Sequence, residues 1–174
     1  MIGHLRSVKD PFRAEKASRM LPEDSGVRVT HVGGELEDGM AVEARQRAED
    51  NPRYEWVGER PRDETMWILS RSRLLVHSSV MEGGAHAISE AIACQTPVLA
   101  SEIPGNVGLL GRDYPGYFPV RSTETLADRL VDAETDDAFY DRLQQGVRSK
   151  NDIVQPAHER EQLRGLFEDV ATLR

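Results

Sequence analysis

Apolar residues in this chain gather in short runs, each closed by glycine, proline or small polar residues. The run at 27–32, for example, is stopped by Gly33 and Gly34, and the run at 54–57 by Gly58. Short runs rich in β-branched and aromatic residues predict strands. The adjacent apolar residues at 74–77 are typical of a parallel strand buried on both faces. We therefore expect strands at 1–2, 27–32, 54–57, 74–77, 97–100 and 117–120.

Longer stretches with helical periodicity separate these runs. Pro11 falls in the first turn of one such stretch, where a missing N–H is tolerated, and Asn51-Pro52 breaks the next. The expected helices cover 11–21, 40–49, 62–70, 123–134, 137–150 and 158–173, and a further helix follows Gly83-Gly84 and runs to about Cys94. This alternation predicts an α/β fold, a three-layer structure with a parallel sheet between helices. Parallel sheets bind ligands at the carboxyl ends of their strands, here Gly3, 33–34, Gly58, 78–84 and 101–106.

Composition narrows the possible partners. Of 174 residues, 39% are hydrophobic and 30% charged, which fits an ordinary globular protein. The net charge of −8 argues against general affinity for nucleic acid or anionic membranes. No apolar run approaches the roughly 20 residues that span a bilayer. Cys94 is the only cysteine, so no intrachain disulfide can form, and we expect a cytoplasmic protein. Met1-Ile2 reads as the tail of a strand, so Met1 need not be the natural start.

The segment at 78–91 carries the most specific chemistry. A buried strand leads into Glu82, then Gly83 and Gly84, then a helix that contains Glu90. Glycine lets a ligand approach the backbone closely, and the N–H groups at a helix start suit a phosphate. At 1.5 Å per residue, the two carboxylates lie roughly 10 Å apart along the axis. That span suits a nucleoside diphosphate sugar, with one carboxylate for the sugar and the other for the ribose.

Glu82 to Glu90 resembles the E-x7-E signature of the retaining, family 4-type (group 1) glycosyltransferases of the GT-B fold. The lead-in at 74–79 and the exit at 96–100 follow the same family. The resemblance implies two Rossmann-like domains, of which this chain matches the second. Residues 1–155 would then be the nucleotide-sugar donor-binding domain, and 156–174 a C-terminal helix that packs toward the N-terminal domain.

The resemblance also implies roles for individual residues. Glu82 would contact the donor sugar and Glu90 the ribose. The backbone amides that follow the first glutamate would contact phosphate or sugar, and by position these belong to Gly83, Gly84, Ala85 and His86.

The family opens its donor domain with a Gly-Arg-Leu…Lys-Gly segment, which here reads Gly3-His4-Leu5-Arg6 through Lys9. Lys9 matches the lysine that neutralises the departing diphosphate, so Lys9 and Glu82 are the expected catalytic pair. His4 stands where the family has arginine. A neutral imidazole cannot replace a guanidinium fork, so either His4 is charged in the complex or Arg6 assists.

A narrower resemblance joins the chain to the selenosugar synthase branch of the family. It is carried by 3–13, by 81–84, by 103–111 and by 114–119. The resemblance implies transfer of N-acetylglucosamine from its UDP-linked form to selenophosphate. Under this interpretation, His4 is a trait of the subgroup.

Several other residues suggest no further chemistry. Asp136-Asp137 lies in a late helical region, so we expect no metal and no cofactor beyond the nucleotide sugar. His31 and His77 are expected to be structural. Trp56 and Trp67 are expected in the core or at its edge, with Trp56 also placed to border the nucleotide base. Lone Cys94 is expected to pack a helix.

Two other classes of function remain open at this point. A UDP-sugar 2-epimerase would bind a similar ligand between two domains, and a non-catalytic nucleotide-sugar-binding module would fit a single domain. The expected partners are the nucleotide sugar and the chain's own N-terminal acceptor domain. A homodimer of the isolated domain is also conceivable through the exposed apolar surface. We expect the domain to be inactive by itself.

Overall fold

The structure is a computed structural model that describes residues 1–154. The helix expected at 158–173, and the assignment of 156–174 as a separate C-terminal element, lie outside the described residues. Every strand pair is parallel, in agreement with the sequence prediction. The strands are β1 (Val29–Val32), β2 (Tyr54–Gly58), β3 (Leu75–His77), β4 (Val98–Ser101) and β5 (Tyr117–Phe118).

The strands form two hydrogen-bonded groups, β1-β2 and β3-β4-β5. Val29 lies opposite Tyr54, and Leu75 lies opposite Val98. The run at 1–2 forms no ladder of its own, because only Ile2 bridges β1, at Val32. Its backbone nonetheless continues along β1: Gly3 N donates to Val32 O at 2.9 Å.

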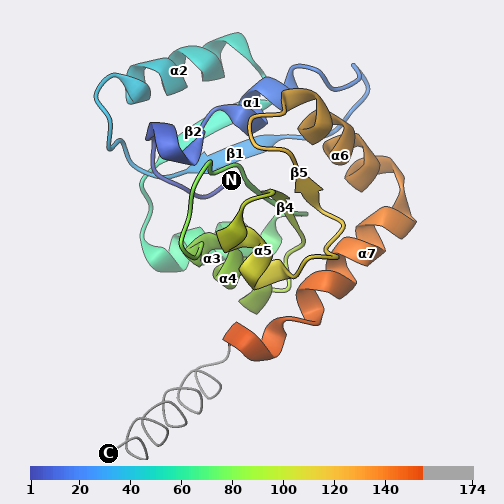
Figure 1. The fold of residues 1–174 in the computed structure, drawn as a ribbon. Helices are drawn as coiled ribbons and strands as arrows, with labels where there is room; N and C mark the ends of the chain where they lie inside the picture. The colour runs from blue at the N-terminus through green and yellow to red at the C-terminus, as the bar shows by residue number, and fades with distance from the viewer. Residues whose placement is uncertain (155–174) are drawn as a thin grey trace, which may run out of the picture.

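Helices cover both sides of the strands (Figure 1). In that view α1 and α2 lie above β1 and β2, whereas α3, α4 and α5 lie below; α6 packs against α1, and α7 contacts both α6 and α4. The structure therefore has the predicted three-layer architecture. The helices are α1 (Arg13–Ser18), α2 (Met40–Asp50), α3 (Arg62–Arg71), α4 (His86–Ala93), α5 (Pro104–Leu110), α6 (Thr123–Thr135) and α7 (Asp137–Arg148), with 3-10 turns η1 (Ser7–Lys9) and η2 (Asn151–Val154).

Two elements near the site can be compared with their prediction. The helix after β3 begins at His86, with Ala85 as its N-cap, so Gly83 and Gly84 lie in the loop that leads into it, as expected. The segment expected as a loop at 101–106 instead enters α5, which has Pro104 at its first position. A proline there is preorganised for a helix start, and this signal was missed because the next residue is Gly105.

The core forms one large cluster on both sides of the strands, and one small cluster made by Leu5, Phe12, Ala41 and Ala44. Every residue of β3 and β4 is buried, which agrees with the apolar runs in the sequence. Trp56 packs at the edge of both clusters as expected, whereas Trp67 is 60% exposed and stacks under Arg71. The prediction for Trp67 was therefore wrong. None of the helices in the described part is long and apolar enough to cross a membrane.

Candidate functional site

A cavity of about 510 Å³ opens at the carboxyl ends of β1 and β3. It is lined by the turn after Ile2, by the β2–α3 connection and by the start of α4. All the predicted site residues line it except Gly83 and Ala85. Ala85 is buried as the N-cap of α4, so only its backbone can serve a ligand. Sequence reasoning missed the contribution of the β2–α3 connection, which brings Glu59 and Arg60 to the wall, and of the start of α3, which brings Arg62 and Thr65.

Lys9 and Glu82 form an ion pair across the floor of the cavity, although 73 residues separate them in the chain. Lys9 ends the turn η1, and Asp10 follows in the left-handed conformation with φ 45°. The Ser78 hydroxyl at the end of β3 donates to the carbonyl oxygens of Lys9 and Asp10, at 3.1 and 2.9 Å. The two loops that carry the pair are thus fastened to each other.

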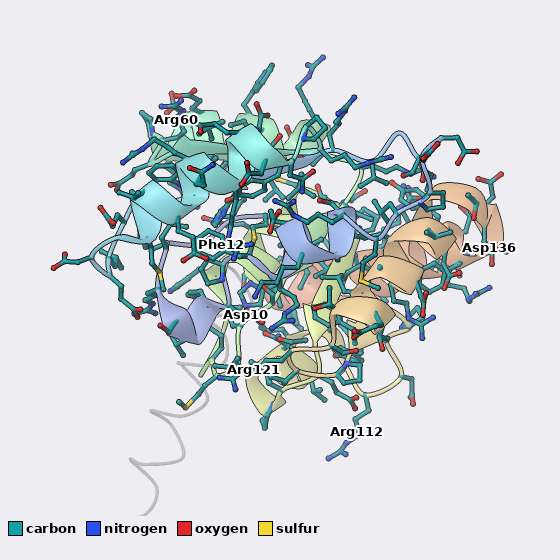
Figure 2. The ribbon with its side chains drawn as sticks, turned by 90° about the horizontal axis from the view of Figure 1, so that it is seen from above. Asp10, Phe12, Arg60, Arg112, Arg121 and Asp136 are labelled. Atoms are coloured by element: carbon teal, nitrogen blue, oxygen red, sulfur yellow. The ribbon has the colours of Figure 1, made fainter. Side chains whose placement is uncertain are left out.

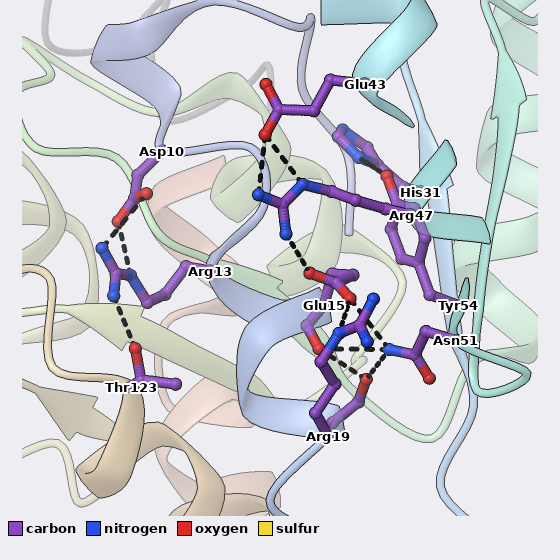
Figure 3. Close-up of polar contacts among 11 residues, drawn as sticks. Asp10, Arg13, Glu15, Arg19, His31, Glu43, Arg47, Asn51, Tyr54 and Thr123 are labelled. Carbon is purple, nitrogen blue, oxygen red and sulfur yellow. Dashed lines mark hydrogen bonds and ion pairs between the residues drawn. The ribbon is translucent and has the colours of Figure 1, made fainter. Parts of the chain in front are cut away.

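A second set of contacts fixes Asp10 from the other side (Figure 3). The Arg13 guanidinium donates to the Asp10 carboxylate at 2.7 Å and to the Thr123 hydroxyl at 2.6 Å. Helices α1 and α6 therefore both hold the turn that presents Lys9. The fold therefore fixes the backbone position of Lys9.

Glu82 lies in a partly buried polar pocket. Its side chain is 12% exposed, and its Oε1 accepts hydrogen bonds from Lys9 and from the Ser79 hydroxyl, the latter at 2.9 Å. Burial opposes ionisation of Glu82, but the hydrogen bonds from Lys9 and Ser79 outweigh it and lower its pKa. Glu82 is therefore a carboxylate at neutral pH.

The loop that carries Glu82 rests on α5. A Cβ atom at Gly105 would lie 2.3 Å from the Glu82 carbonyl oxygen, so only glycine permits this approach. Asn106, in the same helix, donates to the Ser101 carbonyl at 2.8 Å, and Ser101 donates to the Ser79 carbonyl. Helix α5 thus supports the Glu82 loop from behind, a role the sequence interpretation missed.

Glu90 lies in the second turn of α4 and faces the same cavity as Glu82. Its Oε1 accepts a hydrogen bond at 2.7 Å from Arg62, whose side chain is 78% exposed. An ion pair with so exposed a partner is weak, so a ligand hydroxyl can displace Arg62 at little cost. His86 is the first residue of α4 and lines the cavity, as predicted for a residue at the helix start.

His4 and Arg6 come from the turn that enters η1. The Gly34 amide donates to His4 Nδ1 at 3.1 Å, so the ring proton of His4 lies on Nε2 in this arrangement. Arg6 Nε is buried without a hydrogen-bond partner in the described residues. The turn thus brings the permanent positive charge of Arg6 to the cavity, beside a His4 ring whose Nδ1 accepts a hydrogen bond.

The end of β1 is held close to this turn. A Cβ atom at Gly33 would lie 2.0 Å from the Gly3 carbonyl oxygen, and the backbone there has φ 153°. The Trp56 indole donates to the Gly33 carbonyl at 2.8 Å. Trp56 thus braces the turn and is not among the residues that line the cavity, and its placement beside the nucleotide base stays a prediction.

The remaining predicted structural residues can also be placed. His31 is fully buried, with hydrogen bonds to Gly3 O at 2.9 Å and to the Tyr54 hydroxyl at 3.0 Å. Asp136 caps α7 by accepting from the Phe139 amide at 3.1 Å. Figure 2 shows Asp136 at the opposite edge of the molecule from Arg60, which lines the cavity. Cys94 ends α4 at the margin of the core.

Within residues 1–154, no group of three or more His, Cys, Asp and Glu side chains is arranged to hold a metal ion. The charged side chains that line the cavity are four cations and three carboxylates: Arg6, Lys9, Arg60 and Arg62, and Glu59, Glu82 and Glu90. A fold of parallel strands with a polar cavity at their carboxyl ends is a ligand-binding α/β domain.

Comparison with known proteins identifies the family. The profile of the glycosyl transferases group 1 family matches residues 1–150. The chain therefore belongs to the group 1 glycosyltransferases, and its fold is that of the C-terminal Rossmann-like domain of GT-B enzymes. A curated relative, glycosyltransferase 1 domain-containing protein 1 of Xenopus tropicalis, is 31% identical over 119 residues, which is 68% of this chain and 34% of that protein.

Solved structures show the same fold at low identity. HepE of Anabaena in complex with UDP superposes with a TM-score of 0.80 and 19% identity, over 98% of this chain and 47% of that one. HepE was also solved with UDP-glucose. Sucrose-phosphate synthase of Thermosynechococcus elongatus gives a TM-score of 0.79 and 21% identity, over 99% of this chain and 45% of that one. The chain thus spans a third to a half of the length of these proteins.

Proposed function

We propose that this domain binds the donor of a retaining hexosyltransferase, a UDP-linked sugar, and works with an N-terminal acceptor domain of the same polypeptide. One observation carries the proposal: Lys9, Glu82, Glu90 and the start of α4 meet around a single cavity. Lys9 comes from a segment 73 positions before Glu82, and all of these residues are the ones that the family resemblance selects. The UDP and UDP-glucose complexes of HepE, a protein of the same fold, support a uridine nucleotide as the ligand.

The geometry suggests how the donor would lie. The diphosphate would rest against the amides of Gly84, Ala85 and His86 at the N-terminus of α4, where the helix dipole favours negative charge. Lys9 and Arg6 would supply positive charge beside it. Glu82 would face the sugar, and Glu90 would exchange Arg62 for the ribose hydroxyls.

The chemical task is to stabilise charge on the departing diphosphate. As the glycosidic bond breaks, the sugar becomes oxocarbenium-like and the β-phosphate gains negative charge. Preorganised cations and amides aimed at that charge act more strongly in the transition state than in the ground state. Lys9 and Arg6 carry that role in this proposal without a metal ion. Transfer itself would need the acceptor domain, so the isolated domain would bind donor without turnover.

The resemblance to the selenosugar synthase branch supports a finer assignment, with UDP-N-acetylglucosamine as donor and selenophosphate as acceptor. Of the segments that carry the resemblance, 103–111 forms α5, whose Gly105 packs against the Glu82 backbone. By contrast, Tyr114 lies away from the cavity, and its hydroxyl bonds to the backbone of Val98 at 3.0 and 2.7 Å. The segments at 3–13 and 81–84 therefore line the cavity directly, and the α5 segment supports it from behind.

Calorimetric titration of the full polypeptide that contains residues 1–174 tests the donor assignment. We expect UDP and UDP-N-acetylglucosamine to bind, and Glu90→Gln to weaken both by about tenfold, since one charge-assisted hydrogen bond is worth about 1.5 kcal/mol. Glu64→Gln is the matched control, because Glu64 also pairs with an arginine of the α3 region, Arg60 at 3.4 Å, but does not line the cavity. Equal affinities for wild type and Glu90→Gln would refute the ribose contact.

A further inference from the structure

His77 is the last residue of β3, and its side chain is only 2% exposed. Among the described residues, its Nε2 atom has no hydrogen-bond partner. That atom lies 3.8 Å from Oε1 of Glu82, which is too far for a hydrogen bond. Buried polar atoms are nearly always paired, so an unpaired ring nitrogen aimed at a site carboxylate calls for an explanation.

The neighbouring contacts converge on the same oxygen. Oε1 of Glu82 accepts from Lys9 and from the Ser79 hydroxyl, and it is also the atom nearest to His77 Nε2. In the proposed function, Lys9 neutralises the donor diphosphate. A diphosphate competes for the ammonium with more negative charge than one carboxylate carries. When Lys9 turns to the phosphates, a carboxylate that is 12% exposed loses its strongest partner.

We propose that His77 is a positioning residue that donates Nε2–H to Glu82 when the donor diphosphate draws Lys9 away. This inference rests on the proposed function. The shift needed is small, since a gap of 3.8 Å closes to hydrogen-bond distance with a movement of about 0.8 Å. Glu82 is then held by His77 and Ser79 in the orientation that faces the sugar. The proposal thus exchanges the observed Lys9–Glu82 pair for a Lys9–phosphate contact and a His77–Glu82 hydrogen bond.

The protonation state of His77 suits this role. Burial, and then the Lys9 cation, lowers the pKa of His77 to about 4, so the ring is neutral at physiological pH. A neutral imidazole donates one hydrogen bond and leaves the charge of Glu82 intact. A cation at the same place would compete with the developing positive charge on the sugar for the Glu82 carboxylate.

Two replacements separate the hydrogen bond from the packing. His77→Met keeps a similar volume and removes the donor, whereas His77→Gln places an amide N–H near the position of Nε2. In the full polypeptide, we expect His77→Met to weaken the binding of UDP-N-acetylglucosamine and of UDP by about tenfold each, because both carry the diphosphate that draws Lys9 away. The affinity for UMP, which has no diphosphate, should change by less than about twofold, and His77→Gln should restore the loss. Equal weakening for UMP and UDP, or no recovery with Gln, would overturn the proposal. If His77→Met does not fold, His77→Asn replaces it, because its shorter amide cannot reach Glu82.

A second experiment needs no nucleotide, and so does not depend on the proposed function. Lys9→Met removes the competing cation permanently, so His77 should then become a partner of Glu82 in the empty protein. We expect His77→Met to leave the urea midpoint unchanged or higher in wild type, but to lower it by about 0.5 M in the Lys9→Met background. Strict additivity of the two changes would disprove the exchange of partners. Failure of every variant, wild type included, to bind UDP would count against the proposed function alone.

Discussion

Replacing Gly105 with alanine tests the support that α5 gives to the site. The new Cβ would lie 2.3 Å from the Glu82 carbonyl oxygen and 3.0 Å from its carbon, both backbone atoms that cannot rotate aside. Ordinary contact begins at 3.4 Å, so α5 and the Glu82 loop must separate by about 1 Å. Overpacking of this kind costs about 1–3 kcal/mol.

The same helix provides the control. A Cβ at Gly108 meets nothing within 4 Å, so Gly108→Ala should show only the helix-propensity gain, about 0.5–1 kcal/mol. That gain offsets part of the clash at Gly105, whose net effect should be a loss of about 0–2 kcal/mol. Between the two variants the free energy of unfolding should therefore differ by about 1–3 kcal/mol.

Urea denaturation followed by circular dichroism measures this difference, and calorimetry measures its effect on the site. Because the displaced loop carries Glu82, Gly105→Ala should also weaken UDP-N-acetylglucosamine more than UDP. Gly108→Ala should leave both affinities unchanged. If the two variants are equally stabilised and bind equally well, α5 does not support the Glu82 loop as described.

Two further changes probe the polar network beside the site and the buried histidines. Glu15 is fully buried between Arg19 and Arg47 (Figure 3), so Glu15→Gln should lower the unfolding free energy by about 2–3 kcal/mol in urea titrations. The control is Glu43→Gln, because Glu43 also pairs with Arg47 but is exposed. This change should alter the unfolding free energy by less than about 0.5 kcal/mol. Burial lowers the pKa of His31 and His77 to about 4, whereas in the unfolded chain each histidine has its usual pKa of 6.5. Between these two values the unfolded chain binds more protons than the folded one, so stability should fall from pH 7 to pH 5. The loss should be about 1–2 kcal/mol per histidine, and a flat profile would contradict it.

Local patterns in the sequence account for most of the secondary structure. The buried runs at β3 and β4 were recognisable because strands covered on both faces are continuously apolar. The error at α5 has a local cause, since glycines at 105 and 108 weaken any helical prediction. Gly105 is in the helix because a larger residue would strike the Glu82 backbone, a contact that no local pattern encodes.

The site was predicted in the same uneven way. The spacing of Glu82 and Glu90 across a Gly-Gly turn and a helix could be read directly from the chain, whereas Lys9 was selected by the resemblance to the family. Arg60, before α3, and Arg62, at its start, belong to no motif, and they reach the cavity only because β2 ends beside β1. From the sequence, His77 was interpreted as a structural residue of a strand. Nothing in the sequence shows that its Nε2 lacks a hydrogen-bond partner among the described residues.

The sequence by itself therefore determined the alternation of strands and helices, the parallel α/β class and the residue types of the proposed donor site. Those features depend on interactions within a few residues: side-chain periodicity, turn chemistry and the start of a helix. Only the tertiary structure decided that Lys9 pairs with Glu82 across 73 residues, that Arg62 forms an ion pair with Glu90, and that α5 supports the Glu82 loop. Burial and partner choice depend on which distant segments pack together, and that packing is a property of the whole fold.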